Sequence, residues 1–212
     1  MAMDETKAKD RLLLAVLPNV PFDGWSIAAL RAAARGIGVS EAEAITFFPS
    51  NSALVEWFSR WADREMLARI TGAEFEALKV RERVAGAVRA RLAVLEPHRE
   101  AARRGLAVLA LPQNAPLGMR LLYDTVDAIW YAVGDTATDF NFYTKRALLA
   151  GVYGATMLYW LDDRSLDSID THAFLDRRLA DVMSLPKIGA RLREIADRLP
   201  NPLRFLRAAQ RR

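Results

Sequence analysis

Apolar residues recur at intervals of three and four along almost the whole chain, which is the spacing of one face of an α-helix. Alternation of β-branched and polar residues, which would indicate strands, is scarce. Short stretches with proline or glycine separate the periodic segments. The pattern therefore predicts an all-α protein of about ten helices. The expected helices span residues 6–17, 26–35, 40–48, 51–71, 75–96, 99–111, 116–133, part of 134–163, 168–184 and the tail from 187.

Several residues at the expected helix ends favour capping or termination. Pro18 and Pro21 are expected to stop the first helix, because proline interrupts helical hydrogen bonding. Ser26 and Asn51 are expected to cap the helices that follow them, and Ser40, with a glutamate three residues on, matches the capping-box pattern. Apolar residues of the expected 75–96 helix should face the core. They are Leu78, Val84, Val88, Leu92 and Leu95.

The segment 134–163 contains an unusually long apolar stretch. Its residues 147–161 carry no charge, two basic residues precede them, and two aspartates follow. The run is too short to cross a bilayer, which takes about 20 apolar residues in a helix. We therefore expect a buried helix here, because no uncharged stretch of the chain reaches 18 residues.

Small residues recur along one stripe of this run, at Ala147, Ala150, Gly151, Gly154 and Ala155. Each glycine weakens a helix by about 1 kcal/mol relative to alanine, so two on one stripe suggest a use. Two uses are open. One is the close approach of another helix, which is the commoner case, and the other is room for a ligand.

Bulky residues lie on the same run at positions i, i+4 and i+7, namely Tyr153, Met157 and Trp160. Residues at this spacing share one side of a helix, where they could line a cavity. Such a stripe is more often plain core, and a solid bundle would favour a scaffold protein. The candidate pocket residues are Trp130, Gly151, Tyr153, Gly154, Met157 and Trp160.

Polar and charged residues surround Phe140 and Phe142 at the start of the same segment. Two consecutive helical turns cannot bury both rings and keep every charge in water. An exposed aromatic among charged groups is typical of a protein-binding surface. The alternative is a solvated helix start. The polar residues concerned are Asp139, Asn141, Tyr143, Lys145 and Arg146.

The net charge of +4 is concentrated at the C-terminus. Residues 187–212 contain eight basic and two acidic residues, which gives this tail +6 and the remaining chain −2. Pro200 and Pro202 are expected to kink the helix. The composition favours an amphipathic helix at a membrane surface, although docking on the bundle or in a dimer remains open. Its apolar stripe contains Leu192, Ile195, Leu199, Leu203 and Leu206.

The chain lacks the residue patterns of common active sites. Cysteine is absent, and the two histidines, His98 and His172, are far apart and outside any metal-ligand spacing. No G-x-S-x-G elbow or P-loop occurs. The adjacent Asp162 and Asp163 would point in different directions on a helix. We therefore expect a protein that is not an enzyme and that holds neither a metal nor a cofactor. The N-terminal residues resemble neither a signal peptide nor a transit peptide.

Three short helices near the N-terminus have the spacing of a helix-turn-helix, in WSIAALRAAARGIGVSEAEAITFF. This spacing resembles the N-terminal region of TetR-type regulators. The second helix, however, carries Glu41 and Glu43 and no basic residue. Because carboxylates repel phosphate, we expect this part to be a structural relic without nucleic-acid binding.

Over most of its length the chain resembles the lipid-binding accessory protein family of ubiquinone biosynthesis, in a bacterial form. The resemblance rests on LPNVPFDGWSIAALRAAA, on LALPQNAPLGMRLLYDTVDAIWYAVGDTATDFNFYTKRALLAGVYGATMLYWLDD and on DTHAFLDRRL. It implies a TetR-like domain over residues 1–186, with 1–49 as a degenerate helix-turn-helix part, and a basic amphipathic helix over 187–212. It also implies a homodimer.

Members of that family hold an isoprenoid or other lipid in a hydrophobic pocket and dock on the membrane through the final helix. They present quinone intermediates to a di-iron hydroxylase of the pathway. The resemblance therefore implies a cytoplasmic protein that is peripheral on the inner membrane. The alternative is a TetR-type transcription regulator that senses a lipid.

The family's partner surface corresponds here to the residues around Tyr143. Two positions depart from the family pattern, because Phe142 and His172 stand where tryptophan is usual. The loss of an indole donor at Phe142 is expected to weaken that contact, and His172 puts the burial of its position in doubt. The expected partner-binding residues are Asp139, Asn141, Phe142, Tyr143, Lys145 and Arg146.

Overall fold

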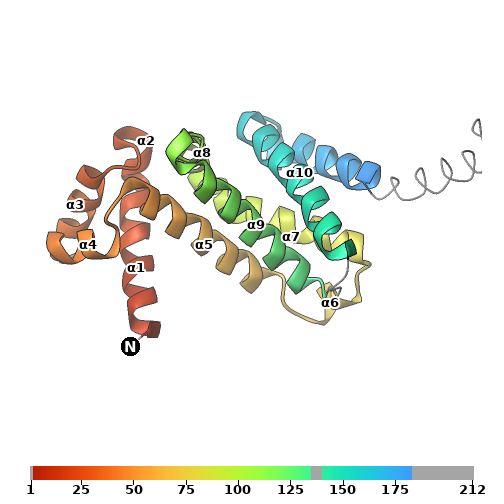
Figure 1. The fold of residues 1–212 in the computed structure, drawn as a ribbon, viewed down its shortest axis with the longest axis horizontal. Helices are drawn as coiled ribbons and strands as arrows, with labels where there is room; N and C mark the ends of the chain where they lie inside the picture. The colour runs from red at the N-terminus through yellow and green to blue at the C-terminus, as the bar shows by residue number, and fades with distance from the viewer. Residues whose placement is uncertain (1, 135–139, 183–212) are drawn as a thin grey trace, which may run out of the picture.

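The computed structural model describes residues 2–134 and 140–182, and none of these residues lies in a strand. The all-α prediction is confirmed. Between the helices are short 3-10 turns, and a last described helix spans residues 169–182. The labelled helices in Figure 1 are α1 (Ala2–Val16), α2 (Val20–Asp23), α3 (Ile27–Gly36), α4 (Glu41–Phe47), α5 (Asn51–Arg69), α6 (Ala73–Ala77), α7 (Val80–Leu95), α8 (Arg99–Leu109), α9 (Ala115–Ala132) and α10 (Phe140–Asp162).

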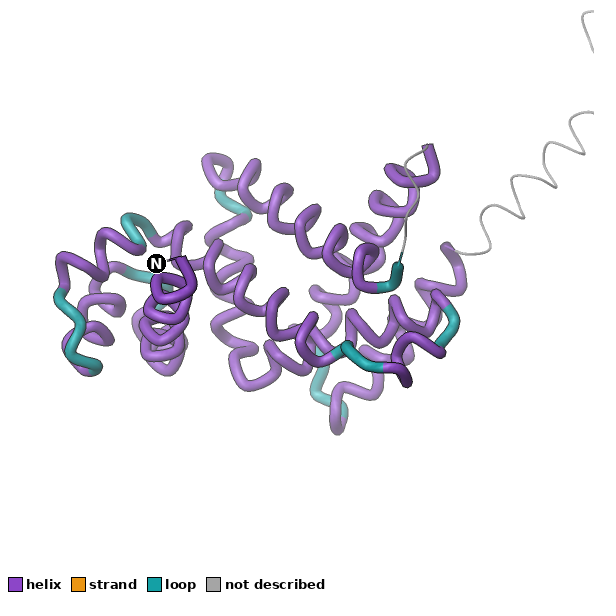
Figure 2. Tube along the Cα trace, turned by 90° about the horizontal axis from the view of Figure 1, so that it is seen from below, coloured by secondary structure: helices purple, strands orange, loops and turns teal. Residues whose placement is uncertain are grey.

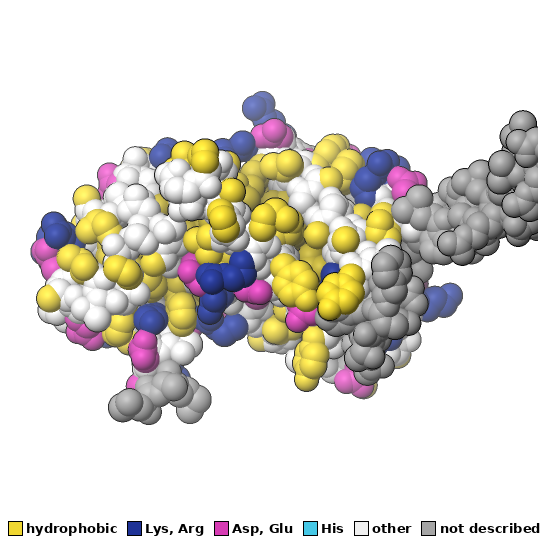
Figure 3. Space-filling view, in the orientation of Figure 1, with side chains coloured by type: hydrophobic (Ala, Val, Ile, Leu, Met, Phe, Trp, Pro, Cys, Tyr) yellow, Lys and Arg dark blue, Asp and Glu magenta, His cyan; other side chains and the backbone are white. Residues whose placement is uncertain are grey.

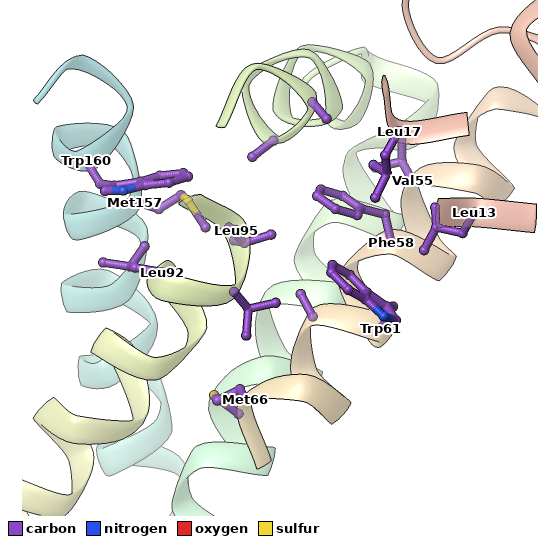
Figure 4. Close-up of a cluster of buried hydrophobic side chains, with 14 of the residues drawn as sticks. Leu13, Leu17, Val55, Phe58, Trp61, Met66, Leu92, Leu95, Met157 and Trp160 are labelled. Carbon is purple, nitrogen blue, oxygen red and sulfur yellow. The ribbon is translucent and has the colours of Figure 1, made fainter. Parts of the chain in front are cut away.

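The helices form a small N-terminal unit and a larger bundle (Figures 1 and 2). Helices α1 to α4 lie together at one end of the molecule, where α1 packs on α3 and α3 on α4. In the bundle, α5 packs against α7 and α9, and α9 packs against α10. Figure 4 shows Phe58 and Trp61 of α5 in the buried region between α1 and the helices that carry Leu92, Leu95 and Met157.

Side-chain contacts hold the N-terminal unit against the bundle. The Nε1 of Trp57 donates to Oδ1 of Asp10 at 2.8 Å, and the Nε1 of Trp25 donates to the carbonyl oxygen of Ala101 at 2.9 Å. Lys9 Nζ lies 5.1 Å from the centroid of the Trp57 ring, within reach of a cation–π contact. Because these contacts join α1 to α5 and the α2–α3 turn to α8, the two units share one continuous core.

The helix N-termini confirm two predicted caps and correct a third. The hydroxyls of Ser26 and Ser40 each accept a backbone N–H at 3.1 Å. For α5 the cap is Ser50 rather than Asn51, because Ser50 has the extended backbone that an N-cap needs (φ −150°, ψ 163°). Its hydroxyl accepts from the amide of Ala53 at 3.1 Å, whereas Asn51 is already in the first turn.

The expectation that Pro18 and Pro21 stop the first helix was only partly right. After α1 ends at Val16, a 3-10 turn and the short helix α2 carry helical geometry on to Asp23. Each proline lies in the first turn of its new element, where its missing N–H is not needed. The prolines therefore redirect the chain, and Gly24, with φ 67°, ends the turn.

The single helix expected over 75–96 was wrong. The structure divides it into α6 and α7, which begins at Val80, and the amide of Lys79 donates to the Glu82 carboxylate at 3.0 Å. Leu78 lies in the connection and is 42% exposed, so it does not face the core. The other four residues of that apolar stripe are buried as expected.

A hydrogen-bonded corner positions the 169–182 helix against α7. The two carboxylate oxygens of Asp163 accept from the amides of Ser165 and Thr171, at 2.8 and 2.9 Å. Arg89 of α7 pairs with Asp176 at 2.6 Å. These contacts place the buried Leu179 beside the bundle, where it forms part of a cavity wall described below.

Candidate functional site

A cavity of about 490 Å³ lies among α5, α7, α8, α9 and α10. We call it the first cavity. Apolar side chains such as Val55, Leu95 and Leu122 make up most of its wall. Met119 and Leu158 also line it and are 67% and 64% exposed, so they belong to its rim. Figure 3 shows apolar side chains gathered between α9 and α10, where the surface is hollowed. An apolar cavity of this size is typical of a small-molecule site.

One buried polar cluster interrupts the apolar wall. Arg91 is 4% exposed, and its Nε donates to Oδ1 of Asp63 at 2.7 Å. Its guanidinium also donates to the hydroxyl of Ser59 at 3.1 Å and to the hydroxyl of Tyr153. Thr125 donates to the same Asp63 carboxylate at 3.0 Å. Five side chains from α5, α7, α9 and α10 therefore meet at one point of the cavity.

The charges of this cluster cancel. Of the described residues that line the first cavity, only Arg91 is charged, and Asp63 behind it supplies the opposite charge. A buried ion pair with further hydrogen bonds avoids the large cost of an isolated buried charge. The polar end of the cavity is therefore neutral overall, while its side chains still offer directed hydrogen bonds.

The hydroxyl of Tyr153 is a hydrogen-bond donor at this polar end. Burial raises the pKa of Tyr153 to about 12, so the group keeps its proton near neutral pH. The oxygen already accepts from Arg91, and no acceptor for its proton is found among residues 2–134 and 140–182. A ligand oxygen that accepts a hydrogen bond would complete this arrangement.

The predicted pocket residues are divided among different places. Tyr153, Gly154 and Met157 line the first cavity, while Trp130 lines a second one. Gly151 is exposed and lines neither of these cavities. Trp160 also lies outside both. It is fully buried, its Nε1 donates to Glu96 at 2.8 Å, and a guanidinium covers its ring.

The two glycines of the small-residue stripe do not serve close helix packing within the described residues. A Cβ added at Gly151 or Gly154 would meet none of their atoms within 4 Å. Gly154 borders the first cavity, so its missing side chain adds room there. Of the two uses that the sequence left open, the geometry at Gly154 agrees with room for a ligand.

Apart from Tyr153, the residues of the polar cluster were not predicted from the sequence, although a signal for Arg91 was present. Arg91 follows Val84 and Val88 at the spacing of a buried stripe, as 84, 88 and 91, with Leu95 after it. A charged residue at a core-facing position indicates either that this face of the helix is exposed there or that the charge is buried with a partner. The partner, Asp63, lies 28 residues away in the sequence, so local spacing could not identify it.

The expected partner-binding surface is only partly described. Tyr143 is 67% exposed. Lys145 lies with its Nζ 5.6 Å from the centroid of the Trp130 ring. Arg146 is buried, and its Nε lies 2.7 Å from Oδ1 of Asp127, so it holds α10 against α9. Asp139 and the side chains of Asn141 and Phe142 lie outside the described residues.

The remaining predictions concern the basic tail, His172, metal binding and membrane spans. The apolar stripe of the basic tail, from Leu192 to Leu206, lies outside the described residues. His172 is half-buried. The described residues contain no His, Asp and Glu cluster that could hold a metal ion. No helix within the described segments is long and apolar enough to cross a membrane.

The arrangement of helices is that of the TetR regulators. A TetR transcriptional regulator from Nitrosomonas europaea superimposes with a TM-score of 0.70 and 20% identity, over 84% of this chain and 98% of the other. A tetR-family regulator from Streptomyces coelicolor gives a TM-score of 0.57 and 16% identity, over 96% of each chain. At these identities the likeness defines the fold alone, and the predicted TetR-like fold is confirmed.

Sequence comparison places the chain within a family. The COQ9 family model matches residues 115–186, which include α9 and α10. The rat mitochondrial ubiquinone biosynthesis protein COQ9 is 35% identical over 92% of this chain and 65% of its own length. The Xenopus laevis protein COQ9-B is 32% identical over 91% of this chain and 67% of its own length. The chain belongs to the COQ9 family, as the resemblance predicted. It spans about two thirds of the length of these relatives.

Proposed function

We propose that this protein is a non-catalytic accessory protein of ubiquinone biosynthesis, and that it binds an isoprenoid or quinone-type lipid in the first cavity. The family carries the link to ubiquinone synthesis, because its curated relatives are named ubiquinone biosynthesis proteins. The observation that carries the lipid is the apolar cavity with one neutral polar cluster.

The chemistry of the polar cluster favours a neutral head group. An anionic head placed beside Arg91 would compete with Asp63, which already neutralises the guanidinium. A quinone or phenol ring instead presents oxygen atoms that accept a hydrogen bond from the Tyr153 hydroxyl. The apolar wall and the rim at Met119 and Leu158 suit an isoprenoid tail that extends toward the surface.

The remaining parts of the proposal follow the resemblance. The basic segment 187–212 binds the membrane surface, which keeps the protein peripheral on the inner membrane. The exposed Tyr143 belongs to the surface that meets the di-iron quinone hydroxylase, and the protein acts as a homodimer. We expect Tyr143→Ala to weaken hydroxylase binding by about tenfold, as truncation of an exposed aromatic anchor does. Pull-down titration checks this, and unchanged affinity would move the interface elsewhere.

Mass spectrometry of lipids that copurify with the protein tests the proposed cavity. We expect a prenylated quinone or an isoprenoid in the wild-type protein. Gly154→Leu should remove it, because the new side chain fills space at the cavity wall. Gly151→Leu is the matched control, since it makes the same change on the same helix outside the cavity.

Both substitutions replace a helical glycine and should raise helix stability by up to about 1 kcal/mol, so neither is expected to unfold the protein. Wild-type protein without any quinone or isoprenoid would contradict the proposed function. Equal lipid content in the two variants would move the lipid out of the first cavity.

The fold also suggests a lipid-sensing transcription regulator. Against it, α4 presents Glu41 and Glu43 where a DNA reader needs basic or amide side chains. Arg35 and Arg31 of α3 are paired with Glu41, the second at 3.6 Å. Specific binding of duplex DNA at physiological salt would favour this alternative over the accessory role.

A further inference from the structure

A second cavity, of about 370 Å³, lies among α7, α9, α10 and the 169–182 helix. It is distinct from the first cavity, because none of its lining residues is shared. Apolar side chains such as Val84, Leu149 and Leu179 form most of its wall. The volume is again in the range of small-molecule sites.

The charged residues of the second cavity are all basic. Arg81, Arg83 and Lys145 line it, and no acidic residue does so within the described chain. Arg81 donates to the carbonyl oxygen of Asp176 at 3.0 Å, and no carboxylate among residues 2–134 and 140–182 forms an ion pair with it. The site therefore differs from the first cavity, where a carboxylate neutralises the arginine.

Two buried donors at this cavity have no acceptor in the part of the chain that the structure describes. The Nε of Arg83 and the Nε1 of Trp130 are both inaccessible to solvent and have no hydrogen-bond partner among residues 2–134 and 140–182. Both residues line the second cavity. Buried donors without partners are costly and rare, so each calls for a physical explanation. Acceptors supplied by a ligand would satisfy these donors.

We propose that the second cavity binds the anionic head group of a single-chain amphiphile, with the aliphatic chain on the apolar wall. The oxygen atoms of a carboxylate or phosphate would accept from Arg83 and Trp130, and the negative charge would be attracted by Arg81 and Arg83. The proposal stands independently of the lipid assigned to the first cavity. The chain's own segment 187–212 is a poor occupant, because its charge of +6 would be repelled.

Calorimetric titration of the full chain with matched probes tests this assignment. The probes are dodecanoate, dodecyl phosphate and dodecanol, each kept below micelle-forming concentrations, with acetate and inorganic phosphate as heads without a chain. We expect at least one anionic amphiphile to bind about tenfold or more tightly than dodecanol, and the two small anions to bind undetectably. Equal affinity for dodecanol, or binding of the small anions alone, would overturn the proposal.

Variants locate the binding. Arg83→Gln should weaken binding of the anionic amphiphile by about tenfold, because it removes a charged donor. Trp130→Phe should weaken it by a smaller factor, because only a neutral donor is lost. Arg120→Gln, which makes the same change at an exposed arginine paired with Glu56, is the control and should leave affinity unchanged. An unchanged affinity in Arg83→Gln would overturn the assignment.

Gly154→Leu distinguishes binding in the second cavity from binding in the first. It fills space in the first cavity and should leave binding of the anionic amphiphile unaltered. If Gly154→Leu abolished that binding while Arg83→Gln did not, the probe would be bound in the first cavity and the second site would be wrong. Arg83→Gln should still copurify with quinone, because the first cavity is unchanged. A loss of amphiphile binding in this variant therefore bears on the second cavity alone, and the proposed function is tested independently of it.

Discussion

The two cavities are similar in size and in their apolar walls, but they differ in how the protein pairs the arginine at the wall. In the first cavity, Arg91 is held by Asp63, Ser59 and Tyr153, so its charge and its donors are satisfied by the protein. In the second cavity, Arg83 has a buried Nε without an acceptor among the described residues, and no acidic residue of the described chain lines the cavity.

The difference shows how one fold can prepare two kinds of site. A neutralised arginine contributes hydrogen bonding and position, and it leaves the cavity suited to a neutral ligand. An arginine without a carboxylate keeps its electrostatic attraction available for an anion. The pairing of charge, rather than cavity volume, therefore separates the expected ligands.

The largest expected effect concerns the paired arginine. Asp63→Asn should destabilise the protein by about 3–5 kcal/mol, because it leaves Arg91 charged and buried without its partner. Arg83→Gln should change stability by less than about 0.5 kcal/mol, since no ion pair is lost. Urea unfolding of both variants checks the contrast. Equal losses of stability would mean that the two arginines are not held differently.

A smaller effect is expected for the hydroxyl of Tyr153. Tyr153→Phe should reduce the preference for a prenylated benzoquinone over a prenyl hydrocarbon of similar length by about tenfold, which corresponds to about 1.4 kcal/mol. The ratio of two ligands is unaffected by a general loss of folded protein. Tyr159→Phe, on the same helix and outside the first cavity, is the matched control. A preference that both variants retain would exclude Tyr153 as the donor that recognises the head group.

The smallest effect is a dependence of stability on alkaline pH. The pKa of Tyr153 is raised from about 10 in the unfolded chain to about 12 by burial. Above pH 10 the unfolded chain loses a proton that the folded protein keeps, so stability is complete below pH 10 and falls as pH rises toward 12. By pH 11 the loss should be about 1 kcal/mol.

Unfolding measured at pH 9 and 11 in wild-type protein and in Tyr153→Phe isolates this contribution. The variant should lose less stability than the wild type over the same interval. Parallel loss in the two proteins would show that the Tyr153 hydroxyl is not buried as described.

Much of the fold could be predicted from periodicity, because each helix buries one face. The errors lie at the ends of elements, where a single residue decides the geometry. Ser50 rather than Asn51 caps α5, and the expected 75–96 helix is divided before Val80, which leaves Leu78 exposed. Periodicity predicts the middle of a helix well, but it predicts poorly the residue at which the backbone leaves helical geometry.

The candidate site was predicted less completely. Tyr153 and Met157 were identified because both lie on one side of α10, and both line the first cavity. Trp160 belongs to the same stripe but lies beyond the cavity, in contact with Glu96. The spacing along a helix identifies a side of that helix, but it cannot show how far a cavity extends along it.

By itself, the sequence determined the helical class, the family and the uncharged run at the centre of α10. It did so because these properties reside in local spacing and in the order of residues. Only the tertiary structure decided that Arg91 meets Asp63 and that Trp130 and Arg83 share a second cavity. Those outcomes depend on how helices far apart in the chain pack together, and packing selects which buried charges find a partner.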